Sequence, residues 1–235
     1  MEDYPYIFPI PTGNVQNELN SRVSIYIPSD NNSNAYFTNY IIFYRIYISN
    51  EEYLSPSEEI FRSINVNLYN DHIRVRPYIG NDSMGSSSLE TLFKNMNYYT
   101  LETEGIDIDS VLSKQNSNLF SNYLTIDFSR DSGNSTIPYL TTGSGPRYNL
   151  LRNSGAGVYV PIPEDRYFLN SAEMRNPDNI YDSFINGDIT DKPDTPRNHT
   201  YVNLYIIASG IDSITFAPLY SSPAHIGVLR LPNQN

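Results

Sequence analysis

The chain has 235 residues, enough to bury a sizeable core in one domain without covalent staples. It contains no Cys, which excludes disulfides, zinc ribbons, cysteine proteases and thiol redox chemistry from this sequence. Lys and Arg number 15 against 26 Asp and Glu, and the formal net charge of −11 argues against binding to a phosphate backbone. Nucleic acid is therefore not an expected partner.

Tyrosine and proline set the structural class. The chain has 21 Tyr and 16 Pro, and charged residues make up only 17% of it. This balance favours short strands and turns over long salt-bridged helices. Residues 4–11 include three prolines and predict an extended segment. Strands are then predicted, in chain order, at 22–27, 36–49, 72–79, 98–103, 123–128, 148–151, 158–160, 200–209 and 226–231.

The strongest of these predicted strands is 36–49. Tyr40, Ile42 and Tyr44 fall on one face, and Ile41 and Phe43 fall on the other. Because both faces are mostly apolar or aromatic, we expect a strand that is covered on both sides.

Short helices are predicted where capping patterns precede apolar residues. Ser55-Pro-Ser-Glu58 places a capping Ser, a Pro at the first helical position and a Glu at the third. Ser87-Ser-Leu-Glu90 repeats the pattern. A helical turn is also expected at 178–185, and the proline-rich 191–197 is expected to be a connection.

These elements predict an all-β, or mainly β, fold, most simply a β-sandwich with a few short helices. We expect one β-rich domain over 1–235. Within it, 51–197 is a possible large insertion or second subdomain.

Two strand patterns resemble a known fold family. Tyr40-x-Ile42-x-Tyr44, and Val202-x-Leu204-x-Ile206-x-Ala208 followed by a turn and a closing strand, resemble strands C, F and G of a fibronectin type III or immunoglobulin-like sandwich. The resemblance implies that 51–197 is inserted between the first of these strands and the other two. The chain has no Trp, and Tyr201 lies one residue out of register with the corner tyrosine of such domains.

A second resemblance concerns location. The phrases Phe43-Tyr-Arg-Ile-Tyr47 and Ser221-Ser-Pro-Ala-His-Ile-Gly-Val-Leu-Arg-Leu-Pro232 are similar to segments of uncharacterised spirochaete envelope lipoproteins. This implies a lipidated Cys upstream of Met1 and an anchor in the outer membrane.

Composition also points to export. The chain is rich in Asn, Ser, Thr and Tyr and poor in Lys, and the first residues lack the basic and apolar regions of a signal peptide. We therefore expect a mature protein of the cell envelope or extracellular space, with the cytoplasm as the alternative. The membrane is an expected partner only through a lipid anchor absent from this chain.

Templates for catalysis and for cofactor or metal binding match poorly. Asp30-x-Asn32-x-Asn34 resembles half of a calcium loop but lacks its Gly and its terminal Glu, so we expect a hairpin loop. Asp131-Ser-Gly133 has no second copy to form a protease dyad. The Gly143-Ser-Gly145 and Gly155-Ala-Gly157 pairs precede no helix and are expected to be loop glycines. We expect no cofactor and name no catalytic residue.

The histidines His72, His199 and His225 lie far apart in the sequence, beside predicted strands or turns. Metal sites usually include one closely spaced ligand pair. We therefore expect strand-end or surface histidines and no metal site, because only the fold could bring them together.

Tyrosine supplies the one candidate ligand-binding surface. Exposed Tyr offers rigid contact area to proteins and stacking area to sugars. The candidates, chosen because their strand faces alternate away from the more apolar side, are Tyr47, Tyr98, Tyr99, Tyr201 and Tyr205. Core filling by the same tyrosines is the competing interpretation.

These observations favour a non-catalytic envelope or surface protein with a binding or scaffolding role towards a protein or carbohydrate. The alternative is an extracytoplasmic hydrolase whose carboxylates converge only in the fold; the candidates are Asp107, Asp109, Glu164 and Asp165. A structural module of a larger assembly is a third possibility, and it would show a contiguous exposed apolar patch.

Overall fold

The computed structural model describes residues 12–14, 22–49, 51–53, 56–80, 89–116, 123–128, 138–143, 145–153, 159–161 and 199–230. These residues form two antiparallel sheets and several short helices, which confirms the predicted mainly β sandwich. The segments predicted at 4–11, 178–185 and 191–197 lie outside the described residues.

The first sheet combines strands from the N-terminal part of the chain with strands from its middle. Its strand order is β1-β2-β6-β7-β8-β5, and β9 also pairs with β8. The strands are β1 (Thr12–Asn14), β2 (Arg22–Tyr26), β5 (Glu102–Thr103), β6 (Tyr123–Asp127), β7 (Tyr139–Thr142), β8 (Arg147–Asn153) and β9 (Tyr159–Pro161).

The second sheet is built on two long strands. Its order is β11-β10-β3-β4, and β12 also pairs with β10. The strands are β3 (Phe37–Ser49), β4 (Tyr99–Thr100), β10 (His199–Ile211), β11 (Pro218–Tyr220) and β12 (Ala224–Arg230). The strands β3, β10 and β12 lie side by side, while membership of the fibronectin type III family stays a prediction.

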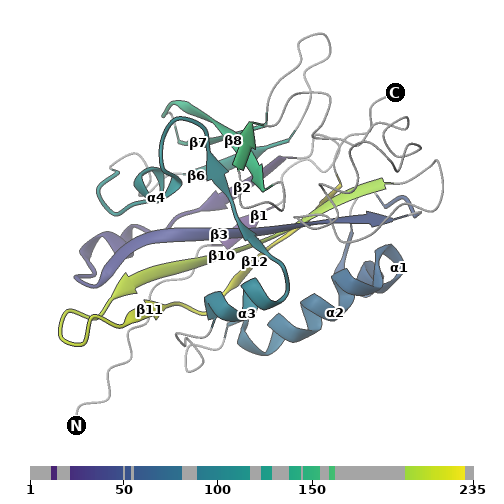
Figure 1. The fold of residues 1–235 in the computed structure, drawn as a ribbon, viewed down its shortest axis with the longest axis horizontal. Coiled ribbons are helices and arrows are strands. Elements are labelled where there is room, and N and C mark those ends of the chain that lie inside the picture. Colours follow the sequence, from purple (N-terminus) through teal and green to yellow (C-terminus); the bar gives the residue numbers. More distant parts are fainter. Residues whose placement is uncertain are drawn as a thin grey trace.

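Helices form a third layer over the second sheet. Figure 1 shows α1, α2 and α3 along one side of β3, β10 and β12, with β6, β7 and β8 on the other side. The helices are η2 (Ser29–Ser33), η3 (Glu58–Ile60), α1 (Phe61–Ile64), α2 (Val66–Val75), η4 (Arg76–Tyr78), α3 (Leu89–Asn95) and α4 (Ile108–Val111).

This layering gives the second sheet a core on each face. Ile42 and Leu204 pack between the two sheets, while Phe43 and Tyr205 pack beneath the helices. Further along the same face, Tyr201 packs with residues of α1 and α2. The long strand at 36–49 is therefore covered on both sides, as predicted.

Residues 51–197 supply strands to both sheets and the helices over one of them. Of the β1–β2 pair, β2 is hydrogen-bonded to β6, so the first sheet extends beyond β2 through strands of the 51–197 segment. In the described residues this segment contributes strands to both sheets, and the interpretation of 51–197 as an insertion or a second subdomain stays a prediction.

Two local predictions are wrong. Residues 72–79 form the end of α2 and the turn η4 instead of a strand, because the chain is already helical from Val66. Residues 30–34 belong to η2 and its C-cap, and they link β2 of one sheet to β3 of the other instead of closing a hairpin.

Candidate functional site

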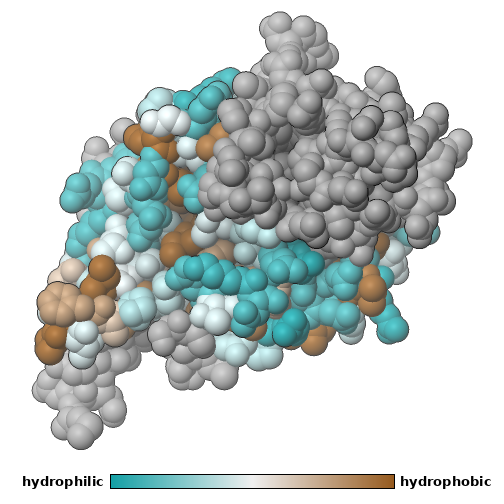
Figure 2. Space-filling model, in the orientation of Figure 1, coloured by the Kyte–Doolittle hydropathy of each residue, from teal (hydrophilic) through white to brown (hydrophobic). Residues whose placement is uncertain are grey.

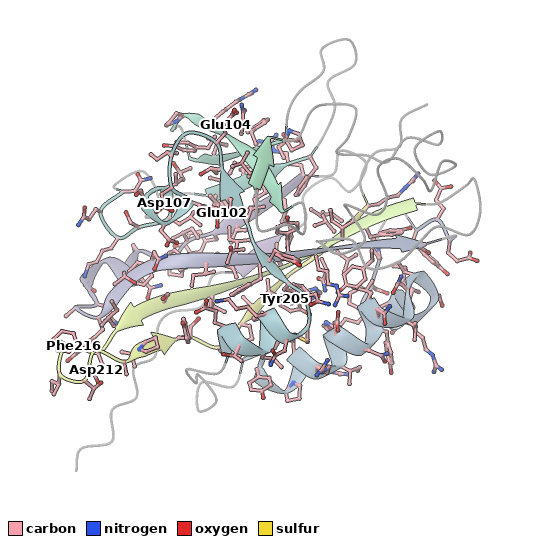
Figure 3. The ribbon with its side chains drawn as sticks, viewed as in Figure 1. Glu102, Glu104, Asp107, Tyr205, Asp212 and Phe216 are labelled. Carbon is pink, nitrogen blue, oxygen red and sulfur yellow. The ribbon has the colours of Figure 1, made fainter. Side chains whose placement is uncertain are left out.

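The five candidate tyrosines do not form an exposed face. Tyr47, Tyr98, Tyr201 and Tyr205 are buried, and Tyr99 is half-buried. The alternation did place three of them on one face of the second sheet, but α1, α2 and α3 cover that face. Figure 3 shows Tyr205 between the sheet and the helices. These tyrosines therefore fill a core, and their hydroxyl groups need partners inside it.

A buried ion pair joins the sheet to α2. Arg45 of β3 donates from Nη1 to Oδ2 of Asp71 at 2.7 Å and also to the carbonyl of Met96. Burial raises the pKa of the Asp71 carboxyl, while Arg45 and a hydrogen bond from Tyr47 oppose the rise. Paired in this way, the Asp71 carboxylate acts as an acceptor only.

A chain of hydrogen bonds leads from Asp71 across the sheet. The Tyr47 hydroxyl donates to Asp71 at 2.8 Å and lies 2.9 Å from the Tyr98 hydroxyl. Asn203 Nδ2 donates to the Tyr98 oxygen at 2.8 Å, and Asn203 Oδ1 lies 2.8 Å from His225 Nε2. Every link is buried or partly buried.

The acceptor at one end of this chain sets the direction of every link. Since Tyr47 donates to Asp71, Tyr98 must donate to Tyr47 and accept from Asn203. The Asn203 oxygen then accepts from Nε2–H of His225, which leaves the lone pair of that ring on Nδ1. Burial, followed by the neighbouring His72, lowers the pKa of His225 to about 3, in keeping with a neutral ring.

His72 lies on α2 beside His225. The two ring centroids are 4.9 Å apart, and Phe61 meets both rings edge-on. His72 Nδ1 is 3.0 Å from the Tyr205 hydroxyl, and Nε2 is 3.2 Å from Oε1 of Glu58. Burial lowers the pKa of His72, and Glu58 partly offsets this effect.

A bulge in β12 turns His225 towards this site. The pairing of β10 with β12 shifts between Leu204, opposite Gly227, and Tyr205, opposite His225. The extra residue resets the alternation of β12, as bulges do. His225 contacts Tyr205, and Val228 also packs on the helix side of the sheet, although an odd and an even position of a regular strand face opposite ways.

The buried polar side chains beneath α2 lie next to a surface cleft that borders this helix. The cleft has a volume of about 800 Å³ and is lined by Ser57, Glu58, Glu59, Tyr69, His72, Ile73 and Arg76. This volume is within the range of small-molecule sites, roughly 300–1,000 Å³. Glu58 and His72 line the cleft, and the His72 ring contacts that of His225, so the last member of the hydrogen-bond chain lies next to the cleft.

No spacing motif in the sequence indicated this site. His72 is buried in a helix, contrary to the expected surface or strand-end position, whereas His225 lies at the start of β12 as expected and yet contacts His72; the side chain of His199 is outside the described part. The sequence around His72 does contain a helix pattern. Asn65 is a good capping residue, and Leu68, His72 and Val75 recur at helical spacing after it.

The predicted carboxylates form a separate group near α4. Asp107 caps α4 by accepting from Asp109 N at 3.0 Å, and Asp109 accepts from Asn39 Nδ2 at 2.8 Å. Burial, then Asp109 and Asp107, raises the pKa of Glu102, and Asp109 has a raised pKa of similar origin. Glu164 and Asp165 lie outside the described residues. Figure 3 shows Glu102 and Asp107 at the side of the molecule opposite the helices.

The remaining motifs have structural roles where they are described. Asn31 of the calcium-like segment is buried and donates to the Tyr40 hydroxyl at 2.5 Å. Gly143 and Gly145 lie in the turn between β7 and β8, as expected for loop glycines. Asp131-Ser-Gly133 and Gly155-Ala-Gly157 are not among the described residues.

The hairpin between β10 and β11 presents a small apolar tip. Ile214 is 75% exposed and Phe216 is 79% exposed. Figure 2 shows hydrophobic side chains at this end of the molecule, and Figure 3 places Phe216 and Asp212 there.

Comparison with known proteins supplies no relative. No protein-family model matches the chain, and no curated protein or solved structure matches it. Among the described residues, no helix is long and apolar enough to cross a membrane.

Proposed function

We propose that this chain is a non-catalytic binding protein of the cell envelope or outer surface, and that it docks a protein partner through the tip of the β10–β11 hairpin. The observation that carries the proposal is the exposure of Ile214 and Phe216 on a turn held rigid by hydrogen bonds. Binding through side chains that are already held in place costs less conformational entropy than binding that must first order them.

Asp212 organises the tip. Its Oδ1 accepts from Ile214 N at 2.7 Å and from Thr215 N at 3.1 Å, and its carbonyl accepts from Phe216 N at 2.8 Å. These backbone bonds lower the pKa of the exposed Asp212 carboxyl. The turn thus holds its shape without a partner.

Phe216 adopts a backbone conformation that is unfavourable for its residue type. Its φ is +56°, in the left-handed region where a bulky residue is uncommon. Such a conformation costs on the order of 1–3 kcal/mol. Because the ring is exposed, side-chain packing within the described residues does not offset this cost; the backbone hydrogen bonds of the turn, including Phe216 N to the Asp212 carbonyl, hold the conformation and keep the ring pointing outwards.

The chemistry of the tip favours a protein over a carbohydrate. Ile211 and Ile214 are exposed aliphatic residues beside the single exposed ring of Phe216, and such a mixed apolar surface suits a protein partner better than a sugar, which is bound by aromatic stacking. Of the five candidate tyrosines, four are buried and Tyr99 is half-buried. The envelope location rests on the export-like composition and on the resemblance to envelope lipoproteins, with the membrane reached through a lipid anchor.

The test is capture of envelope proteins from the source organism by immobilised protein. Replacement of both Ile214 and Phe216 by Ser should abolish specific capture, since it removes the apolar contact and leaves the Asp212 turn in place. Val66→Ser, at an exposed apolar position of α2, is the matched control and should capture as the wild type does. Equal capture by all three proteins would contradict the assignment to the hairpin.

A hydrolase is the second candidate function, favoured by the raised pKa values of Glu102 and Asp109. Paired carboxyl groups with shifted pKa values are a mark of acid–base sites. Screening of glycoside and ester substrates against the wild type and Glu102→Gln tests it. Turnover that is lost in the variant would support the hydrolase, and turnover by neither protein would count against it.

A further inference from the structure

We infer that Glu58, His72 and His225 bind a zinc-class divalent transition-metal ion where α2 and η3 meet β12. One ligand atom from each residue lies within 4.8 Å of the others. The inference is independent of the hairpin proposal, because none of these residues belongs to β10, β11 or the turn between them.

The three ligand atoms lie somewhat further apart than the ligands of a bound ion, and movement of the Glu58 side chain can shorten the distances that involve it. Zinc bonds to nitrogen and carboxylate oxygen are about 2.0–2.2 Å long, so tetrahedral ligand atoms lie roughly 3.4 Å apart. His72 and Glu58 are already at 3.2 Å. The Glu58 side chain is 53% exposed and can move towards an ion without disturbing the core.

Both imidazole rings are oriented as metal ligands are. A metal-bound histidine usually donates its other N–H to an oxygen that fixes the ring. His225 directs Nε2 at Asn203 Oδ1, which leaves Nδ1 with the lone pair. His72 Nδ1 lies 3.0 Å from the Tyr205 hydroxyl, and in the tautomer in which Nδ1–H donates to that oxygen the lone pair of the ring is on Nε2. The hydrogen-bond chain that begins at Asp71 thus fixes the tautomer of His225, the fourth side chain along it, and leaves the lone pair on Nδ1.

His72 Nε2 is a buried polar atom without a well-aligned hydrogen bond in the described part of the chain, and a bound ion would give it a partner. The His72 side chain is 2% exposed, and this nitrogen makes no well-aligned hydrogen bond within the described residues, although Glu58 lies beside it. Buried polar atoms without partners are rare and call for a specific explanation. An ion between Glu58 and the two rings gives each of the three groups a partner.

The donor set selects the type of ion. Two imidazole nitrogens and one carboxylate suit zinc and neighbouring transition metals, whereas calcium and magnesium prefer oxygen ligands throughout. Three protein ligands leave one position of a tetrahedral ion open. Since Glu58 and His72 also line the cleft, solvent or a small ligand could reach that position.

Zinc titration of the metal-free full chain tests the inference, with competition against a chromophoric chelator as the readout. The wild type should bind one zinc ion per chain, and an excess of magnesium should not displace it. Glu58→Gln should weaken binding roughly tenfold or more. Glu59→Gln, the adjacent exposed carboxylate of the same cleft, is the matched control and should bind as the wild type does.

Cobalt substitution gives a second readout that a purely structural role would not change. Cobalt in the wild-type site should show the visible absorption of a low-coordinate nitrogen- and oxygen-ligated ion, and His225→Gln should lose it. Because His225 is partly buried, circular dichroism must show that this variant is folded; if it is not, Glu58→Gln decides the matter. Absence of stoichiometric zinc binding by the wild type, or an equal loss in Glu58→Gln and Glu59→Gln, would overturn the inference.

Discussion

At the scale of single residues, the side chains under α2 depend on one another because each hydroxyl or amide both donates and accepts. Tyr98 stands in the middle of this chain, between Tyr47 and Asn203. Burial raises the pKa of Tyr98 well above its ordinary value, so the hydroxyl stays protonated and can donate. Removing it takes the acceptor from the buried Asn203 Nδ2 and the donor from the Tyr47 oxygen, which then keeps only its bond to Asp71.

We therefore expect Tyr98→Phe to lower the free energy of unfolding by about 1–3 kcal/mol, the usual cost of a buried unsatisfied group. Tyr123→Phe is the matched control, because Tyr123 is exposed and should change stability by less than about 0.5 kcal/mol. Urea denaturation measures both values. A Tyr98→Phe protein as stable as the control would mean that the hydrogen-bond chain contributes nothing net.

Glu102 makes a pH-dependent contribution whose sign follows from its environment. Burial and the nearby Asp109 and Asp107 raise its pKa above the ordinary value of 4.5, so the folded state binds the proton more tightly than the unfolded chain does. Its contribution to stability is then present at acid pH and is lost as the pH rises through the raised pKa. At neutral pH the charge of Glu102 opposes folding.

Glu102→Gln should therefore be more stable than the wild type at pH 7, by up to about 1 kcal/mol because the group is partly solvated. The difference should vanish below the ordinary pKa of a glutamate. Thermal unfolding of both proteins across this pH range tests it, with the exposed Glu51→Gln as control. A Glu102→Gln protein that is less stable at pH 7 would contradict the sign.

At the scale of elements, α2 matters most, since it carries both Asp71 and His72 to the sheet. Its N-cap Asn65 accepts from Asn67 N at 2.8 Å and from Leu68 N at 3.3 Å. Ser57, the N-cap of η3, makes no such side-chain bond. The two positions therefore provide a matched pair.

Asn65→Ala should cost about 1 kcal/mol, as the loss of a working N-cap does. Ser57→Ala should cost almost nothing. Chemical denaturation with circular dichroism measures both, and equal effects at the two positions would show that the cap of α2 is not what starts this helix.

Sequence patterns predicted the strands better than the helix layer. Alternation placed Tyr201 and Tyr205 on the face opposite Val202, which is correct. It could not show that short helices cover this face, because coverage depends on segments distant in sequence. Around His72 two patterns compete: Ile73 and Val75 imitate the alternation of a strand, while Leu68, His72 and Val75 recur at the helical spacing that the structure adopts.

The contact between His72 and His225 cannot be predicted from the sequence for a second reason. His225 faces the helices because of a one-residue bulge, and nothing local to β12 specifies the bulge except Gly227, whose φ of 143° suits an irregular strand. A site assembled from an isolated helix position and an isolated strand position leaves no spacing motif. Only the packing of α2 on the sheet brings the two rings together.

At the scale of the whole molecule, β3 and β10 connect all three layers. Adjacent residues of β3 enter different cores: Ile42 packs between the sheets, and Phe43 stacks on Phe93 of α3 with ring centroids 4.4 Å apart. A strand shared by two cores cannot lose one of them without exposing half of its side chains. We therefore expect the sandwich and the helix layer to unfold together.

Ile42→Val and Phe43→Leu test this coupling with changes small enough to keep the protein folded. Ile42→Val should cost about 0.5–1.5 kcal/mol and Phe43→Leu about 1–3 kcal/mol. Hydrogen exchange of backbone amides then distinguishes the two models. If the layers are coupled, each variant speeds exchange in α2 and in β6 by the same factor, because both amides are exposed by the same global opening. If the helix layer opens alone, Phe43→Leu speeds exchange in α2 and leaves β6 unchanged, and the polar network beneath α2 would then be a locally opening site rather than part of a single cooperative core.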